Sequence, residues 1–315
     1  MRPLPFAFLY LACLAGMLGG LFGARRALGA GAFVAVEPPP EEDAREPAMA
    51  LPPKPQGASP DRAAAGEGPA RHVTPESCEA RTGELRDLCF QVLARQGAAR
   101  DPQESARWCA RVQDPALREE CVADVAEGAA PVDRSASEAL CATVASRKWR
   151  GQCHFGIGLA LAEVDSAYAL GRCEHAETFR DFCRHDVVGE VALVDVDAAV
   201  AFCAREEGDP ITRKTCWHGI GKYLARRDAS EAAAACARAT LEWRGNCVHG
   251  AGWGAAERDV DAALAGCASL PAHADNCTQG VAHQQKRVDP ARAVALCEGI
   301  ATARIRARCL AFVRR

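Results

Sequence analysis

The sequence predicts an all-α protein built from helical hairpins, and three periodic features support this prediction. Sixteen of the 17 cysteines follow a spacing that alternates between a long gap of fixed length, as from Cys89 to Cys109, and a short gap, as from Cys109 to Cys121. An aspartate stands eight residues before the second cysteine of every long gap, and a small side chain stands four residues before it. A pattern that recurs about every 30–33 residues is typical of proteins that stack one supersecondary unit many times. We therefore expect about seven to eight repeats of roughly this length.

The composition narrows the class of partner. The chain has 315 residues, of which 49% are hydrophobic and only 6% aromatic, with a formal net charge of -3. A hydrophobic content that comes largely from alanine favours closely packed helices. Nucleic acid requires a concentrated basic face, which this charge balance does not offer, so we expect no nucleic-acid partner.

Residues 1–32 form an apolar segment that suits either a signal peptide or a membrane anchor. The apolar run Leu4–Gly23 follows Arg2 and is itself followed by Arg25 and Arg26. About 20 apolar residues are long enough to span a bilayer, which favours an anchor. The sequence Ala30-Gly31-Ala32 resembles a signal-peptidase cleavage site, which favours a secreted protein. Under either interpretation, the cysteines favour export of the rest of the chain.

Residues 33–74 are rich in proline, alanine and glutamate and are predicted to form a disordered linker. Such a composition cannot bury enough apolar surface to offset the entropy lost on ordering. We expect this linker to hold the repeat domain, residues 75–315, away from the membrane.

The aspartates and the small residues predict one helix of each hairpin. An aspartate before a helix accepts hydrogen bonds from free backbone N–H groups, which contributes about 0.5 to 2 kcal/mol. The small residue lies one helical turn before the cysteine, so both share a face that packs closely on a neighbour. The aspartates are Asp101, Asp133, Asp165, Asp195, Asp228, Asp259 and Asp289. The small residues are Ser105, Ser137, Ala169, Ala199, Ala232, Ala263 and Ala293.

The other helix of each hairpin carries an arginine column and a glycine column. An arginine stands three residues before the cysteine in seven of eight repeats, and its regularity indicates ion pairs with acids such as Asp87, Glu119 and Asp181, or capping of preceding carbonyls. Glycine recurs three residues after the cysteine, where it costs a helix about 1 kcal/mol relative to alanine. This recurrence indicates either close packing or ligand access.

The cysteines are predicted to pair across the short gaps. Pairing across the long gaps would leave Cys78 and Cys309 without partners, whereas pairing across the short gaps uses all sixteen. Each bond would then join the second helix of one hairpin to the first helix of the next. The predicted pairs are Cys78–Cys89, Cys109–Cys121, Cys141–Cys153, Cys173–Cys183, Cys203–Cys216, Cys236–Cys247, Cys267–Cys277 and Cys297–Cys309.

Disulfides on this scale indicate an extracytoplasmic location, periplasmic or at the cell surface. Metal binding is the competing use of cysteine, but zinc sites need close pairs and no two cysteines here are nearer than ten residues. We therefore expect no metal site and no cofactor.

These columns resemble those of the α/α-hairpin repeat proteins, in particular cysteine-rich, disulfide-stapled members of the tetratricopeptide-like solenoid superfamily. The resemblance covers residues 75–315 and rests on the cysteine period, the small residues and the aspartate caps. The chain lacks the usual tetratricopeptide signature and its strict repeat length, so no binding residue can be transferred. The resemblance implies a right-handed solenoid that binds a protein or peptide on its concave face.

The candidate ligand-binding or catalytic residues lie in and beside a column of histidines. His185, His218 and His249 stand two residues after the cysteine in three consecutive repeats, and His154 lies nearby in the repeat before. Imidazoles suit metals, proton transfer or anionic partners. Helices spaced about 8 to 10 Å apart would nevertheless hold these rings too far apart for one shared ion. The candidate ligand-binding residues are His185, His218, His249, Trp217, Trp253, Gly219, Gly221, Gly250 and Gly252. A column of histidines packed between helices is the alternative, and burial is the alternative for the tryptophans.

Two functional hypotheses follow. The first is a non-enzymatic, membrane-tethered scaffold that binds a protein or peptide partner. The second is a metal-dependent or acid–base enzyme that uses the histidine column. The sequence favours the scaffold, because repeat folds mostly bind and no nucleophile accompanies the histidines.

Overall fold

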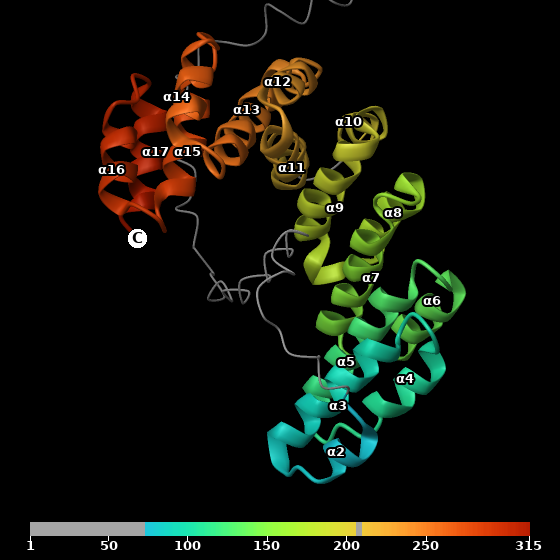
Figure 1. Ribbon diagram of the computed structural model, residues 1–315. Helices are drawn as coiled ribbons and strands as arrows, with labels where there is room; N and C mark the ends of the chain where they lie inside the picture. Colours follow the sequence, from blue (N-terminus) through green and yellow to red (C-terminus); the bar gives the residue numbers. More distant parts are fainter. Residues whose placement is uncertain (1–72, 206–209) are drawn as a thin grey trace, which may run out of the picture. The chain divides into compact units, whose positions relative to one another are not determined.

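The computed structural model describes residues 73–205 and 210–315, and all regular structure in that part of the chain is helical (Figure 1). It contains 16 α-helices and two short 3₁₀-helices. The prediction of an all-α protein is therefore confirmed for the described residues. The apolar segment 1–32 and the linker as far as residue 72 lie outside them. Among the helices of the described residues, none is both long enough and apolar enough to cross a membrane.

Long and short helices alternate along the chain after a first short helix, α2 (Pro75–Glu79). The long helices have 11 to 18 residues and the short ones 7 to 10. The long helices are α3 (Gly83–Gly97), α5 (Pro115–Ala129), α7 (Arg147–Leu161), α9 (Arg180–Val194), α11 (Pro210–Arg227), α13 (Leu241–Ala256), α15 (Ala274–Gln285) and α17 (Ala303–Val313). The short helices are α4 (Pro102–Cys109), α6 (Arg134–Thr143), α8 (Ser166–Arg172), α10 (Val196–Arg205), α12 (Ala229–Ala237), α14 (Val260–Ala268) and α16 (Pro290–Glu298). The 3₁₀-helices Cys173–His175 and Glu177–Phe179 connect α8 to α9.

The predicted aspartates cap the short helices. Each of the seven carboxylates accepts a hydrogen bond from a backbone N–H in the first helical turn, as in Asp101 from Glu104 at 2.8 Å and Asp289 from Arg292 at 2.9 Å. These N–H groups have no partner within the helix, so the aspartate fixes where each short helix begins. The prediction of helix caps is confirmed.

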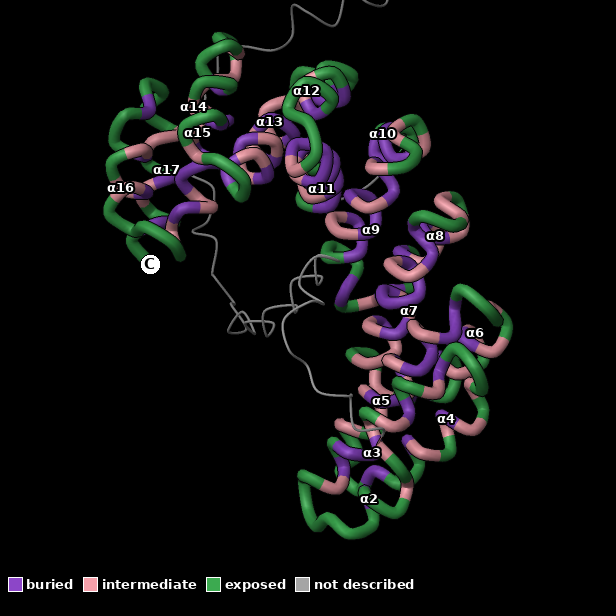
Figure 2. The backbone as a smooth tube through the Cα atoms, in the orientation of Figure 1, coloured by how far each residue is buried: buried purple, intermediate pink, exposed green. Residues whose placement is uncertain are grey.

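The long helices form one continuous layer. Each long helix packs on the next from α3 to α17, and each short helix packs on the long helices on either side of it (Figure 1). The short helices barely contact one another. Figure 2 shows the resulting burial along α7, α9, α11 and α13, and the predicted small residues of the short helices are all buried as well. The core therefore lies among the long helices and between the long and the short helices.

Eight disulfides join consecutive elements, and their pairs are those that the sequence predicts. The first joins α2 to α3, and each of the others joins a short helix, or the residue that follows it, to the next long helix. The Cα atoms of bonded cysteines lie 5.3 to 5.7 Å apart, within the usual range for a disulfide. Each bond closes a short loop and fixes where the next long helix begins.

The arginine column caps carbonyl groups. Arg118 donates from Nε to the carbonyl oxygen of Val112 at 2.9 Å, and Arg306 donates to that of Ile300 at 2.8 Å. Arg150 and Arg244 bind the carbonyls before their own helices in the same way. Of the two roles that the sequence indicated, capping of preceding carbonyls is made by four of the seven arginines. Arg86 and Arg150 also form ion pairs, with Glu79 and Glu177.

The acids beside the arginines mostly serve another purpose. Asp87 lies 3.8 Å from Arg86, but its two carboxylate oxygens accept hydrogen bonds from the N–H groups of Gln113 and Asp114, both at 2.9 Å. Glu119 and Asp275 bind the equivalent N–H groups in other hairpins. At these three acids the bonds fasten one hairpin to the start of the next long helix, and Asp181 accepts instead from the Thr212 hydroxyl of α11 at 3.2 Å.

Candidate functional site

The predicted histidines lie in contact along the long-helix layer. His185 Nε2 lies 2.9 Å from His218 Nδ1, and the rings of His218 and His249 have centroids 5.0 Å apart. These residues belong to α9, α11 and α13, and each is partly buried. The two alternatives that the sequence left open therefore both apply in part, because the rings pack between helices and remain partly accessible.

His283 on α15 extends the histidine column. Its Nδ1 lies 3.0 Å from His249 Nε2, and the centroid of the Phe312 ring of α17 lies 4.0 Å from that of its own ring. In α15 the position two residues after the cysteine holds Gln279, and His283 lies one turn later on the same face. The one-turn offset from position 279 was the signal in the sequence that could have identified His283 as a member of the column. We call His185, His218, His249 and His283 the histidine column.

The Trp253 ring lies beside three histidines of the column, with its plane steeply inclined to theirs. The centroid of its ring lies 5.9 Å from that of His218, 6.3 Å from that of His249 and 6.2 Å from that of His283. The Lys222 ammonium lies 5.0 Å from the Trp253 ring, at a distance suited to a cation–π interaction. Trp253 is partly exposed and remains a candidate contact residue.

Trp217 does not belong to this face. Its side chain is only 2% exposed and lies in the core, so it cannot stack on a ligand. The structure thus corrects its place among the ligand-binding candidates and agrees with the alternative that it is a core residue.

The glycines let neighbouring helices touch. A β-carbon added to Gly219 would lie 2.2 Å from the carbonyl oxygen of His185, and one added to Gly221 would lie 2.0 Å from that of Cys247. The first glycine of the pair thus faces the preceding long helix and the second faces the following one. Gly250 and Gly252 repeat this arrangement one hairpin later, at 2.1 Å from the His218 carbonyl oxygen and 2.2 Å from that of Cys277.

This contact accounts for the glycine column without a ligand, because backbone already fills the space beside each glycine. It also brings the backbones of neighbouring long helices into direct contact, an approach that larger side chains at these positions would prevent. That closer approach is why the imidazoles of successive hairpins meet.

Asp186 anchors one end of the column. Its Oδ1 lies 2.6 Å from His185 Nδ1 and accepts a hydrogen bond from the Tyr223 hydroxyl at 2.8 Å. Burial raises the pKa of Asp186, but these bonds outweigh it and hold the pKa below its ordinary value. Burial and the Asp186 charge raise the pKa of Tyr223. Because of these two shifts, Asp186 is ionised and the Tyr223 phenol is protonated at neutral pH.

The other members of the column are held neutral. Burial and then the neighbouring His249 hold the pKa of His218 well below its ordinary value, and burial followed by His283 does the same for His249. For His283, burial and the Lys286 charge lower the pKa to about 4. At neutral pH these three side chains are therefore uncharged.

The hydrogen bonds link the histidines and fix the tautomers at one end of the column. An ionised Asp186 accepts from His185 Nδ1, and His185 Nε2 shares a hydrogen bond with His218 Nδ1 at 2.9 Å. At the other end the Gln279 amide lies 3.4 Å from His283 Nε2, so His283 donates from Nδ1 to His249 Nε2. His249 and His283 then carry their proton on Nδ1. Most ring nitrogens of the column bond to one another, to Asp186 or to Gln279, and the column brings no nucleophile with it.

Within the described residues there is no group of three or more histidine, cysteine, aspartate or glutamate side chains suited to a metal ion. The pair His185 and His218 supplies only two nitrogens. The Lys222 charge adds to burial and the neighbouring histidines in lowering the pKa of His218, and it would repel a metal cation in the same way.

The neutral histidines predict a stability that falls in acid. The unfolded chain binds a proton at each histidine near pH 6.5, whereas folded His283 does so near pH 4. Between these values the unfolded chain holds more protons, so the free energy of unfolding falls as the pH is lowered through this window. The loss from His283 alone is on the order of 3 kcal/mol at pH 4.

Denaturant unfolding at pH 7 and pH 4 measures this loss. His283→Gln should lose less stability than the parent between the two values. His273→Gln, which lies outside the histidine column, should behave as the parent does. An equal pH dependence for the parent and His283→Gln would contradict the assignment.

His154 lies outside the column. Its ring contacts His175, with centroids 5.4 Å apart, and its buried Nδ1 has no hydrogen-bond partner among the described residues. Burial and the Arg172 charge lower the pKa of His154 to about 4. It stands one residue after its cysteine rather than two, which turns it to a different side of the helix.

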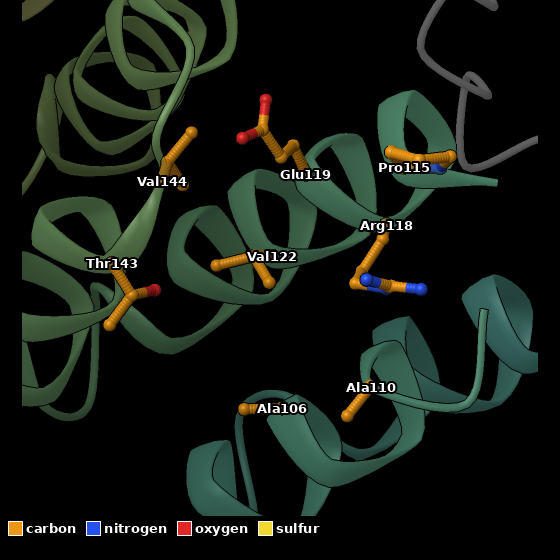
Figure 3. A pocket seen from close by; sticks show the side chains of 8 residues that line it. All are labelled: Ala106, Ala110, Pro115, Arg118, Glu119, Val122, Thr143 and Val144. Carbon is orange, nitrogen blue, oxygen red and sulfur yellow. The ribbon is translucent and has the colours of Figure 1, made fainter. Parts of the chain in front are cut away.

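A separate hollow of about 290 Å³ lies between α4, α5 and the end of α6 (Figure 3). Ala106 and Ala110 line one side of it and Val122 another, with Arg118 and Glu119 nearby (Figure 3). The arginine binds the carbonyl of Val112, and the glutamate binds N–H groups at the start of α7. The charged groups of the hollow are thus already engaged, and it offers a ligand mainly small apolar contacts.

Comparisons with protein-family models, with curated proteins and with solved structures gave no match to this chain.

Proposed function

We propose that this chain is an exported, membrane-tethered and non-enzymatic scaffold that binds a protein or peptide partner. Its architecture would be a right-handed α/α-hairpin solenoid of seven to eight repeats. The observation that carries the proposal is the continuous long-helix layer, in which each hairpin packs on the next and is joined to it by a disulfide. Stacks of this kind present extended surfaces to partners.

Export is supported by the eight disulfides. Bonds of this kind persist in oxidising compartments and are rare in the cytosol. The proposed location is therefore periplasmic or at the cell surface, with residues 1–32 acting as signal peptide or anchor. Residues 33–74 would then serve as the tether.

The long-helix layer is the proposed binding side. Its helices approach until backbone meets backbone at Gly219, Gly221, Gly250 and Gly252, whereas the short helices barely contact one another. A stack whose elements lie closer on one side curves towards that side, so the long helices would line the concave face. The histidine column and Trp253 lie on this layer.

The alternative is an acid–base or metal-dependent enzyme built on the histidine column. The hydrogen bond between Asp186 and His185 favours it, because a carboxylate orients a general base in this way. The partner nitrogen of His185 faces His218 rather than a nucleophile, however, and the neutral imidazoles accept protons only in acid. The scaffold therefore fits the geometry better.

Site-specific photo-crosslinking tests the scaffold. A photoreactive amino acid at Lys214, which is exposed on α11, is expected to give a discrete protein adduct in the cells that produce this chain. The same amino acid at Ala234, which is exposed on the short helix α12, is the matched control and should give none. Absence of an adduct at position 214, or equal adducts at both positions, would contradict binding on the long-helix layer.

A further inference from the structure

Three cations surround the C-terminal part of the histidine column. Lys214 stands four residues before His218 on α11, and Arg308 stands four residues before Phe312 on α17. Residues one helical turn apart share a face, so both cations lie on the side of the helix that faces the column. Lys286 follows the last turn of α15, and its ammonium lies 4.5 Å from the Phe312 ring.

The charges of all three cations reach His283, and those of Lys214 and Arg308 also reach His249. The charges of Lys214 and Arg308 both help to lower the pKa of His249 and of His283, after burial as the largest cause. Two long helices, α13 and α15, separate the helices that carry these two cations.

No carboxylate of the described residues balances these charges. Lys214, Lys286 and Arg308 form no ion pair with any of them, whereas many other arginines are paired, as in Arg226 with Glu257. The histidines beside them are neutral and add no negative charge. Asp186, the acid that bonds to the column, lies at its other end and is engaged by His185 and Tyr223. The result is a local positive face on a chain whose net charge is -3.

We propose that this face binds an acidic peptide segment of the partner protein, an inference that rests on the proposed scaffold function. The cationic histidine face, as we call it, consists of Lys214, His218, His249, His283, Lys286 and Arg308. Carboxylates of the peptide pair with the three cations, and the neutral, partly exposed imidazoles pack beside its side chains. Cations without a carboxylate partner suit such a ligand.

An acidic peptide fits this face better than a nucleic acid. Single-stranded nucleic acid binds through aromatic faces on which its bases stack. Here the Trp253 ring is set edge-on against three histidines with Lys222 on its face, and Phe312 packs on His283. Lys222 thus engages the Trp253 ring, and His283 and Lys286 engage the Phe312 ring. Three cations are also few for a phosphate backbone.

Fluorescence anisotropy with defined peptides tests the proposal on the full disulfide-bonded chain. A labelled glutamate-rich peptide of about 12 residues should bind, and its affinity should fall when salt is raised from about 50 to about 500 mM, because salt screens exposed charges. A glutamine peptide of the same length should bind at least about tenfold more weakly. The double variant Lys214→Glu/Arg308→Glu should weaken binding of the acidic peptide by about tenfold or more.

A charge-matched control separates the face from net charge. Arg100→Glu/Arg107→Glu makes the same change at exposed positions of the first hairpin and should alter affinity less than about twofold. All four positions are exposed, so each variant should keep the parent's melting temperature, which is measured alongside. Equal weakening by both double variants, or equal binding of the glutamine peptide, would overturn the proposal.

The remaining outcomes distinguish the two proposals. Tighter binding of a single-stranded DNA of matched length than of the acidic peptide would replace the peptide by nucleic acid as the ligand. If the acidic peptide does not bind but the photo-crosslinked adduct at position 214 is still formed, the proposal of an acidic ligand is overturned and the scaffold function is not. Failure of both would remove the scaffold function as well.

Discussion

Gly221→Ala is expected to destabilise the protein by about 3 kcal/mol or more. The added β-carbon would lie 2.0 Å from the carbonyl oxygen of Cys247, and backbone on both sides of the contact leaves no flexible atom to move. Alanine favours a helix over glycine by about 1 kcal/mol, which offsets only part of this cost. Because the contact sets the spacing of α11 and α13, the variant should also separate His218 from His249.

Two glycines of the short helices are matched controls. Gly171 on α8 and Gly266 on α14 have no atom within 4 Å of an added β-carbon. Gly171→Ala and Gly266→Ala should therefore stabilise the protein by up to about 1 kcal/mol. Denaturant unfolding of the three variants measures the difference. A stable Gly221→Ala variant would show that the long helices do not need backbone contact.

Reduction of the disulfides is expected to unfold the repeat domain. Each bond closes a loop of 10 to 13 residues, which contributes about 3 kcal/mol on a chain-entropy basis. Eight such bonds together exceed the roughly 5 to 15 kcal/mol by which domains are usually stable. The reduced chain must then rely on a core rich in alanine, whose small side chains bury little apolar surface each.

Circular dichroism of the reduced and alkylated chain measures this effect. The expected result is loss of the cooperative thermal transition. A sample treated with the alkylating agent alone should melt as the parent does. A reduced chain that melts within about 5 °C of the oxidised one would show that the disulfides are dispensable for the fold.

The features that the sequence predicts well are local. An aspartate, a small residue and a cysteine within eight positions define a capped short helix, and the cysteines that pair follow one another along the chain across the short gaps. Such relations depend on helical geometry over a few turns, so spacing alone reveals them. The Asp101 cap and the Cys109–Cys121 bond are examples of predictions that the structure confirms.

The features that the sequence could not predict link residues one repeat apart. The contact of Gly219 with the His185 carbonyl, the bond from Tyr223 to Asp186 and the pairing of Asp87 with Gln113 depend on how closely successive hairpins approach. Ordinary helix packing suggested a spacing of about 8 to 10 Å, whereas the glycines let backbone meet backbone. The ring contacts of the histidine column depend on that approach, and so does the proposed cationic histidine face.

Disulfide mapping by mass spectrometry of the non-reduced, proteolysed protein tests the central claim most directly. The claim is that one bond per hairpin joins each short helix to the next long helix, which sets the long helices in one layer and the histidines in register. The account predicts eight links across the short gaps, including Cys203–Cys216 and Cys236–Cys247. A link across a long gap, such as Cys89 to Cys109, would contradict it.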